Sequence, residues 1–389
     1  MRGLMIPPVT KVTLLLLVLF SLVVCLFRLN IYNRLLAIAE GPQVQPETDS
    51  RPVPKPSKPV YADISIPFLT LVPGLSVFYP WVLITTTYVE TTILGFLATG
   101  ATLLYGGRYC ERVWNSKELA RFLLIVGVSS NVAAWATAIF EYALVSATVA
   151  EKNADNSNTS TPVGKEFYLL QPINGGIAFQ LAFLVALKQL VPEHSIVLFR
   201  GLFTIKVKHL VFPTLVLYTL IGIVYFRDLP FISQVWAGFF ASWIYLRFLR
   251  YTYVDPVLPT TTAATSNDSG VSIKSAPGKI RIRGDASEVF SLANFFYPAL
   301  LRDLIQSLAT VVFRTLVAIK ICTPFAQDEV EQGNLRASIR TTGNTAASAG
   351  GNGAGPSSAA GPRSAAEIEA DRRRALALKA LDEKLKTAQ

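Results

Sequence analysis

The sequence has little charge and few of the residues that usually carry chemistry. Only 16% of its 389 residues are charged, whereas a soluble domain carries roughly 25%. Its two histidines, His194 and His209, and its three cysteines, Cys25, Cys110 and Cys322, form no cluster with metal-ligand spacing. An odd number of scattered cysteines also argues against a disulfide framework. We therefore expect no metal, no cofactor and no disulfide-rich fold.

Long apolar runs dominate instead, with 51% hydrophobic residues and a mean hydropathy of +0.41. Several of them approach the ~20 residues with which a helix crosses a hydrocarbon layer of ~30 Å. These runs are about Val12–Phe27, Thr86–Tyr105, Leu119–Val149, Tyr168–Leu190, Leu210–Phe226 and Phe231–Leu249. The sequence therefore predicts an all-α membrane protein whose residues 1–251 form a six-helix transmembrane bundle. The first run resembles a signal peptide, but the nearest small-x-small site, Ala37-Ile38-Ala39, lies well beyond it, which favours a retained helix.

Charge in the loops between these runs predicts the orientation of the chain. Residues 106–121 hold four basic and two acidic side chains (4 − 2 = +2), and residues 188–209 hold four and one (4 − 1 = +3). Residues 150–167 hold two and three (2 − 3 = −1). Because basic loops stay in the cytosol, both termini should be cytosolic. Asn158, which begins the sequon Asn158-Thr159-Ser160, is then a candidate glycosylation site in a lumenal loop.

The net charge of +10 lies on a membrane protein and marks no basic face of a soluble fold. We therefore expect membrane lipids as partners and no nucleic acid. The apolar stretch at 64–77 is interrupted by Pro67, Pro73 and Gly74. We therefore expect it to lie half-submerged at the membrane interface rather than to span the membrane.

The remainder of the chain divides by composition. Residues 252–287 are polar and predict a linker, and residues 326–366 are of low complexity and predict disorder. Between them, residues 288–325 predict an amphipathic interfacial helix, because Arg302, Gln306 and Arg314 form one polar stripe. A seventh span is the alternative, but each charge near the membrane centre costs roughly 2.5 to 3.5 kcal/mol.

Residues 367–389 predict a terminal helix with acidic residues first and basic residues later, as the helix dipole favours. Its candidate partner-binding residues are basic ones near its start and leucines on one face, namely Arg372, Arg373, Arg374, Leu378, Leu381 and Leu385. Two turns of leucine are too few for a coiled coil alone. A partner-binding helix and a solvated tail helix both remain open.

One membrane hairpin carries a recognisable motif. Trp81 leads into a glycine-containing helix, and Gly107 and Glu111 form Gly-x-x-x-Glu at its end. This segment resembles the second transmembrane segment of rhomboid proteins. The resemblance implies a Gly-x-Ser-Gly sequence at the start of a later helix, and a histidine with two small residues four apart on the last core helix.

Neither catalytic group is present at the corresponding positions. Where Gly-x-Ser-Gly belongs, the chain reads Gly175, Gly176, Ile177, Ala178. Gly238 and Ser242 keep the spacing of the small residues on the last helix, but Val235 stands at the position of the base. A serine nucleophile needs an adjacent base, so Ile177 and Val235 are degenerate catalytic positions and the resemblance implies a pseudoprotease.

The glycines are better interpreted as packing residues, because small residues let transmembrane backbones approach closely. Gln180 should then hydrogen-bond inside the bundle rather than face lipid. We expect Glu111 to be structural and to bond to neighbouring backbone or to a basic residue of the loop that follows it.

Within the rhomboid-like superfamily the chain is most similar to the transmembrane protein 115 family. The residues that carry the similarity are LVALKQ at 184–189, SWIYLRF at 242–248, LANFFYPALL at 292–301, IKIC at 319–322 and DRRRALALKALDEKLK at 371–386. Membership implies a Golgi membrane protein without catalytic activity. It also implies a scaffold or adaptor that supports retrograde transport from Golgi to endoplasmic reticulum by binding a vesicle-tethering complex in the cytosol.

Three other functions stay open at this point. An active intramembrane protease conflicts with the apolar side chains at positions 177 and 235. A lipid or small-molecule transporter would need intramembrane charges or broken helices, and such candidates are few, namely Glu90 and Glu141. A derlin-like role in handling misfolded proteins of the endoplasmic reticulum differs only in location and partners. The sequence also leaves open whether copies of the chain form a homo-oligomer.

Overall fold

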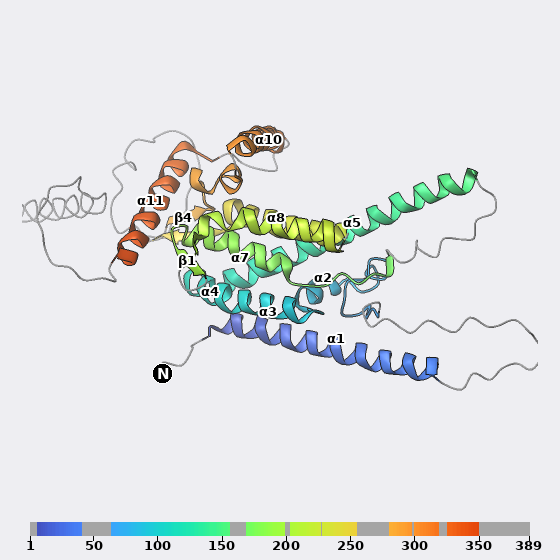
Figure 1. Cartoon of the computed structure of the whole chain (residues 1–389). Helices are drawn as coiled ribbons and strands as arrows, with labels where there is room; N and C mark the ends of the chain where they lie inside the picture. Colours follow the sequence, from blue (N-terminus) through green and yellow to red (C-terminus); the bar gives the residue numbers. More distant parts are fainter. Residues whose placement is uncertain are drawn as a thin grey trace, which may run out of the picture. The chain divides into compact units, whose positions relative to one another are not determined.

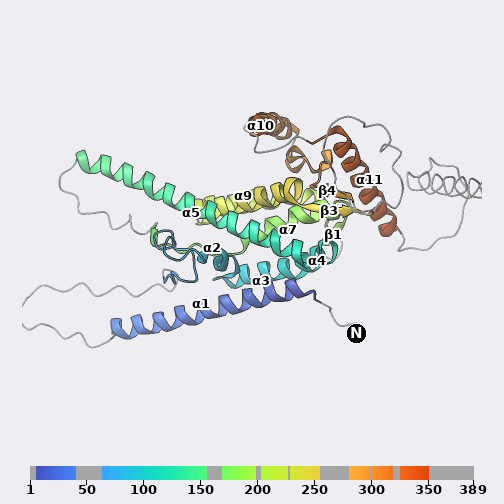
Figure 2. The same ribbon diagram turned by 180° about the vertical axis from the view of Figure 1, so that it is seen from behind.

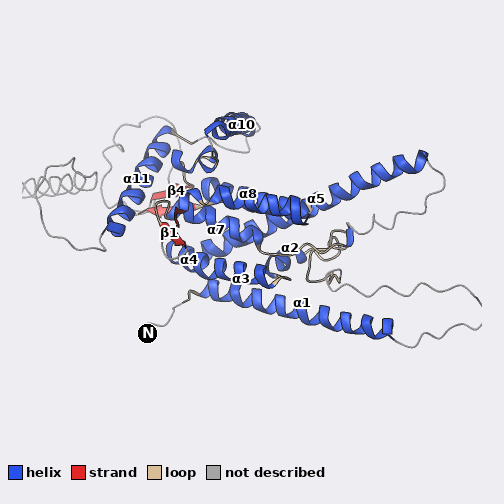
Figure 3. Cartoon of the chain, in the orientation of Figure 1, coloured by secondary structure: helices blue, strands red, loops and turns tan. Residues whose placement is uncertain are grey.

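The computed structural model describes most of the chain in two compact units. The described residues are 6–40, 64–155, 169–198, 203–226, 228–254, 280–297, 299–318 and 325–349. The first unit comprises Met1–Leu187 and Val211–Gly284, and the second comprises Lys188–Leu210 and Asp285–Gln389. Figure 3 shows helices throughout and only short strands. The expected all-α fold is therefore corrected to a mostly helical one.

The apolar runs of the first unit form its helices (Figure 1). They are α1 (Pro8–Glu40), α2 (Val82–Thr85), α3 (Ile93–Thr102), α4 (Arg108–Trp114), α5 (Ser116–Asp155), α7 (Ile177–Leu190), α8 (Val211–Ile221) and α9 (Leu229–Ile244). Wider π-helical turns extend α3, α8 and α9 over Leu103–Gly107, Gly222–Phe226 and Tyr245–Leu249. Both views show α1 beside α3 (Figures 1 and 2).

The described residues contain four helices long and apolar enough to cross a membrane, rather than six. They are Pro8–Ile38, Ser116–Thr148, Val207–Tyr225 and Leu229–Leu249. A fifth results if Val82–Tyr88 and Ile93–Trp114 are one span, but these two segments are bent by 95° at their junction. The span expected over about 86–105 is therefore not one continuous helix, since the chain is non-helical at residues 89–92.

The expected span over 168–190 is also corrected. Only α7 is a continuous helix there, and its 14 residues reach about 21 Å. Residues on every side of α7 are fully buried, including Phe179, Leu181, Phe183 and Val185. A helix that is apolar all round is either a membrane span or part of a protein core, and the burial of α7 by other segments shows the latter. Because protein rather than lipid surrounds α7, its neighbouring backbone need not be helical at membrane depth.

The proline-broken segment 64–77 forms no spanning helix, and much of it is buried in that core. Leu71 and Val72 have no exposed surface, and Ile66 has 2%. Leu71 pairs with Ile173, whose amide donates to the Leu71 carbonyl over 2.8 Å. Turns that satisfy their own amides let this non-helical segment pack against the residues that precede α7.

Aromatic packing and a long helix pair complete the first unit. Helix α5 packs along α9, as the reverse view shows (Figure 2). The ring of Phe122 on α5 contacts Trp114, Phe183 and Tyr245, with centroid separations of 5.3, 6.0 and 5.6 Å. These rings come from four separate segments, so the cluster packs α4 and α5 against the middle of α7 and the π-helical turn after α9.

A short hairpin replaces both ends of the expected linker at 252–287. Strands β3 (Tyr251–Val254) and β4 (Ile280–Arg283) pair antiparallel, with Tyr251 opposite Arg283. Gly284 follows with a φ of +56°, and a Cβ there would lie 1.8 Å from the Arg247 carbonyl oxygen. Only glycine permits the backbone turn at position 284. The strands themselves are short and border a polar stretch, so composition alone could not distinguish them from a linker.

The second unit contains β1 (Ser195–Leu198) paired with β2 (Phe203–Lys206), and the helices α10 (Ala299–Ala318) and α11 (Gln327–Ala349). Helix α10 is shorter than the amphipathic helix expected over 288–325, because 3₁₀ turns and extended residues precede it. Helix α11 falls inside residues 326–366, so disorder was the wrong prediction for its part of that segment. The terminal segment 367–389 lies outside the described residues.

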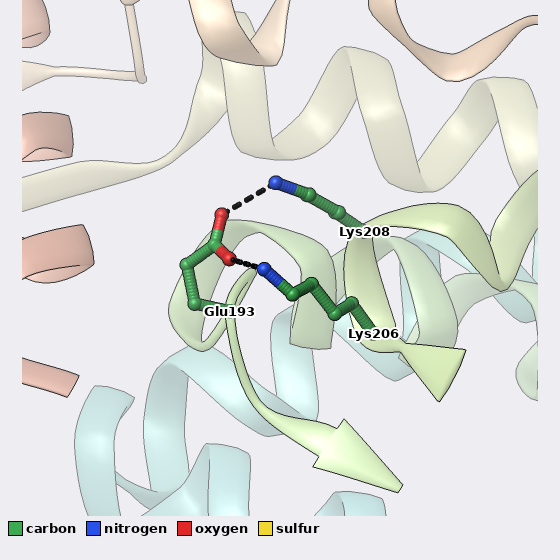
Figure 4. Close-up of polar contacts among 3 residues, drawn as sticks. All are labelled: Glu193, Lys206 and Lys208. Carbon is green, nitrogen blue, oxygen red and sulfur yellow. Dashed lines mark hydrogen bonds and ion pairs between the residues drawn. The ribbon is translucent and has the colours of Figure 1, made fainter. Parts of the chain in front are cut away.

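Polar contacts join the segments of the second unit. Lys188 donates to the Asn294 carbonyl over 2.6 Å and lies 3.5 Å above the ring of Phe295. Gln189 donates to Asp285 over 2.9 Å. At the start of the β1–β2 hairpin, both carboxylate oxygens of Glu193 accept from lysines, over 2.8 Å from Lys206 and 2.6 Å from Lys208 (Figure 4). These hydrogen bonds lower the pKa of the Glu193 carboxyl below its ordinary value.

Candidate functional site

Two glycines shape the start of α7, where a rhomboid nucleophile would be expected. Gly175 has a φ of +112°, which side-chain-bearing residues rarely adopt. A Cβ on Gly176 would lie 2.5 Å from a methyl carbon of Thr99 and 3.1 Å from the Thr87 carbonyl oxygen. Ile177 then begins the helix and is half-buried. The sequence therefore turns sharply into α7, with a hydrocarbon at the first helical position.

Glu90 occupies this helix start. It lies in the break of the bent pair, between Tyr88 and Ile93. Its Oε1 accepts from the Gly176 amide and from the Thr99 hydroxyl, each over 2.7 Å. A carboxylate is favoured there because the unpaired amides and the dipole of a helix start are both positive. The Gly176 amide, which directly precedes α7, thus already donates a hydrogen bond to the Glu90 side chain.

A chain of side-chain hydrogen bonds extends from Glu90 across the unit. Gln180 on α7 donates to the Thr99 hydroxyl over 3.0 Å and accepts from the hydroxyl of Tyr218 on α8. The expectation that Gln180 bonds inside the bundle is confirmed. It is 8% exposed, so its amide is satisfied by protein rather than by lipid or solvent.

A second set of bonds reaches the same glycines from α9. Gln234 donates to Asn131 over 2.9 Å and to the Gly175 carbonyl over 3.4 Å. Asn131 in turn donates to the Leu83 carbonyl and to the Thr87 hydroxyl, over 2.7 and 2.8 Å. Sequence reasoning missed Gln234 and Asn131, although an amide within an apolar run is the same signal that identified Gln180.

The structure places Ile177 and Val235 on adjacent helices. Val235 has no exposed surface and precedes Gly238 by one helical turn. A Cβ on Gly238 would lie 2.7 Å from the Ala178 Cα and 2.8 Å from its carbonyl oxygen. The backbones of α7 and α9 therefore meet here. Ile177 and Val235 offer no atom that could attack a carbonyl or accept a proton.

The Gly-x-x-x-Glu motif forms a second polar cluster at the start of α1. Glu111 accepts from the amides of Val9 and Thr10 over 2.9 and 2.8 Å. It also accepts from the hydroxyls of Thr10 and Ser116 over 2.7 and 2.6 Å. Gly107 gives this contact room, since its Cβ would be 3.3 Å from the Thr10 hydroxyl oxygen. Glu111 thus bonds to backbone, as expected, but to that of a distant helix, and its partners include no basic residue among those described.

The other expected site residues play peripheral parts or lie elsewhere. Trp81 is half exposed and donates to the Phe68 carbonyl over 3.2 Å. Ser242 is buried and donates to the Phe239 carbonyl within its own helix. Asn158 and the terminal residues Arg372, Arg373, Arg374, Leu378, Leu381 and Leu385 lie outside the described residues.

These features define the class of the protein as an integral membrane protein with several apolar helices around a buried central one. Comparisons agree. The family described as "Eukaryotic integral membrane protein (DUF1751)" matches residues 11–387. The chain is 26% identical to the yeast (Saccharomyces cerevisiae) "Transmembrane protein 115 homolog" over 98% of this chain and 93% of the relative.

Two further relatives connect the chain to rhomboid-like proteins. "Rhomboid-like protein 19" of Arabidopsis thaliana is 27% identical over 65% of this chain and 67% of the relative. The human (Homo sapiens) "Transmembrane protein 115" is 25% identical over 79% of this chain and 68% of the relative. No solved structure matches. The chain belongs to the transmembrane protein 115 family of rhomboid-like eukaryotic integral membrane proteins.

Proposed function

We propose that the protein is a non-catalytic scaffold or adaptor of the Golgi membrane. In this proposal it supports retrograde transport to the endoplasmic reticulum by binding a vesicle-tethering complex in the cytosol. The main support for a loss of catalysis is the hydrogen bond that the Gly176 amide donates to the Glu90 carboxylate. With hydrocarbon side chains at Ile177 and Val235, these positions supply neither the serine nucleophile nor the histidine base of a rhomboid protease.

The absence of catalysis has a direct test. Purified protein should cleave no transmembrane substrate with a destabilised helix and should not react with a fluorophosphonate probe. An active rhomboid protease assayed alongside supplies the positive control. Specific cleavage, or covalent labelling that heat denaturation abolishes, would contradict the proposal.

The adaptor function should reside outside the membrane helices, because the polar groups at the start of α7 bond mainly to one another. The candidate is the terminal segment 367–389, with Leu378, Leu381 and Leu385 on its docking face. Loop charges favour a cytosolic location for it. Helix α10, which precedes this segment in the sequence, suits the role of an interfacial membrane anchor. Exposed charges such as Arg302 and Arg314 alternate with apolar residues along it.

The test of the adaptor function is substitution of the three tail leucines by alanine in the full-length chain. The variant should insert and fold as the wild type does. It should lose partner proteins in co-purification and fail to rescue a retrograde-transport defect. Leu335→Ala on α11, which is 61% exposed, is the matched control and should rescue fully. Full rescue by the triple variant would refute a role of the tail, and recovery of an extraction ATPase would favour the derlin-like alternative.

One observation favours a second candidate, a lipid or small-molecule carrier. A span broken at a carboxylate, as at Glu90, is a feature of transporter binding sites. Substrate-dependent flux in proteoliposomes that Glu90→Gln abolishes would support it. Equal flux in empty liposomes and in those with wild-type protein would exclude it.

A further inference from the structure

A cavity of ≈ 270 Å³ lies beside the helix break, lined by α1 and by the first residues of α3. Two opposite charges line it, Arg28 from α1 and Glu90 from the break. The hydroxyl-bearing residues Ser21 and Thr91 also line it, together with apolar residues such as Leu22. Ionisable groups within a membrane span are costly and usually mark a functional site. The adaptor function uses neither Arg28 nor this cavity.

The two charges lie at different depths. Arg28 follows Thr10 by 28 − 10 = 18 residues, about 27 Å along α1. A span that starts near Thr10 therefore places Arg28 near the far edge of a hydrocarbon layer of ~30 Å. The Glu90 amide donates to the Ser21 hydroxyl over 3.0 Å, so Glu90 lies about 10 Å deeper than Arg28. The cavity thus runs inward from a cation at headgroup level to a carboxylate.

One oxygen of the Glu90 carboxylate, Oε2, takes no part in the two hydrogen bonds at the helix start. Oε1 of Glu90 accepts both bonds from Gly176 and Thr99. Among the described residues, none donates a hydrogen bond to Oε2. A Cβ on Gly95 would lie 2.6 Å from that oxygen, so glycine leaves it room. A ligand at this level should therefore present a donor.

The surroundings of the cavity suit hydrocarbon chains. Ile93 and Leu94 are 82% and 80% exposed, and Leu22 is 53% exposed. In a membrane these exposed apolar surfaces face lipid. The cavity, at ≈ 270 Å³, is slightly smaller than typical ligand sites, which span roughly 300–1,000 Å³. It can hold a polar headgroup region, while attached chains lie along α1 and α3.

We propose that the cavity binds a phosphosphingolipid. The phosphate accepts hydrogen bonds from the Arg28 guanidinium at headgroup level. Deeper in the membrane, the amide and hydroxyl of the sphingoid backbone donate to Glu90 Oε2 and exchange hydrogen bonds with Ser21 and Thr91. A glycerophospholipid with the same headgroup has ester carbonyls at this depth. These only accept, and facing a carboxylate they would leave it unsatisfied.

The test compares sphingomyelin with phosphatidylcholine, which share the phosphocholine headgroup and differ in backbone donors. Native mass spectrometry of the full-length protein in detergent measures retention of each at equal concentration. We expect sphingomyelin to be retained about tenfold better, because a hydrogen bond to a charged group is at stake. Glu90→Gln should reduce this ratio towards one, whereas Arg28→Gln should weaken both lipids and leave the ratio unchanged. Glycerophosphocholine, which has no chains, should displace neither.

A pair of tryptophan variants keeps the proposal testable if Glu90→Gln fails to fold. Leu22→Trp fills the cavity without removing a hydrogen bond and should reduce retention of sphingomyelin at least fivefold. Leu19→Trp is the matched control, since Leu19 is a 46% exposed leucine on the same helix outside the cavity. Equal retention of the two lipids by the wild type would overturn the proposal. Equal effects of Leu22→Trp and Leu19→Trp on sphingomyelin retention would also overturn it.

Discussion

Gly238→Ala should destabilise the membrane bundle, although it adds a single methyl group. The new Cβ would lie 2.7 Å from the Ala178 Cα, 2.8 Å from its Cβ and 2.8 Å from its carbonyl oxygen. Real Cβ atoms essentially never approach heavy atoms within 3.0 Å. Because the obstacle is backbone of α7, a rotamer change cannot relieve it. Helices α7 and α9 must move apart, and that strains the hydrogen bond between Gln234 and Gly175.

Two opposing effects set the size of the change. Overpacking a close-packed interior typically costs ~1–3 kcal/mol. Replacing glycine by alanine inside a helix contributes up to ~1 kcal/mol in the other direction. We expect a net loss of about 1–2 kcal/mol for Gly238→Ala. Gly238→Leu should cost considerably more and prevent normal assembly, because several atoms must then be accommodated at the same backbone contact.

The measurement is the apparent melting temperature in detergent, monitored by size-exclusion retention after heating. A loss of 1 kcal/mol corresponds to roughly 2–4 °C in a unit of 150–250 residues. Gly100→Ala is the matched control, because its Cβ would meet only a Leu17 methyl carbon at 3.7 Å. That variant should melt at or slightly above the wild-type temperature. If Gly238→Ala melts as Gly100→Ala does, the close backbone contact between α7 and α9 is wrong.

Two further predictions concern the acidic residues. Glu111→Ala should detach the start of α1, at a cost above the ~1–3 kcal/mol of one unsatisfied buried group, and should expose the buried Cys110 to maleimide labelling. Arg121→Gln, at an exposed ion pair, should leave labelling unchanged. Glu193→Gln should lower stability at pH 7 by at most ~1 kcal/mol, because both lysines are partly exposed. Since the folded pKa of Glu193 is lowered, its stabilisation is present above the unfolded pKa and disappears as pH falls through the folded pKa. The difference between variant and wild type should therefore vanish in acid, and a difference that persists there would contradict the ion-pair explanation.

Hydropathy predicted the membrane class and the positions of four spans, because burial of apolar surface in lipid is a property of local composition. It could not predict that α7 is central. A run of apolar residues reads alike whether lipid or protein surrounds it, and only the tertiary fold decides. The same limit explains segment 64–77, where prolines correctly predicted a non-spanning stretch but not its burial against the residues before α7.

The candidate site was predictable in part. Gly175, Gly176, Gly238 and Gln180 were identifiable because glycines and amides are unusual in an apolar helix. The role of Glu90 was not, since it depends on the break that brings residues 86 positions apart within hydrogen-bond distance. The hairpin of β3 and β4 escaped detection for a related reason, because strands of four residues separated by a long polar stretch have no local signal.

The contact between Glu90 and Gly176 has a consequence for attempts to restore catalysis. A serine placed at position 177 and a histidine at position 235 would return the missing side chains to adjacent helices. The helix start beside them would still carry a carboxylate, hydrogen-bonded to the Gly176 amide, where an oxyanion would need positive donors. Negative charge fixed at that point repels a second negative charge in a medium of low dielectric constant. Under the proposed function, Glu90 therefore opposes catalysis as well as Ile177 and Val235, and restoring it also requires reshaping the break between Tyr88 and Ile93.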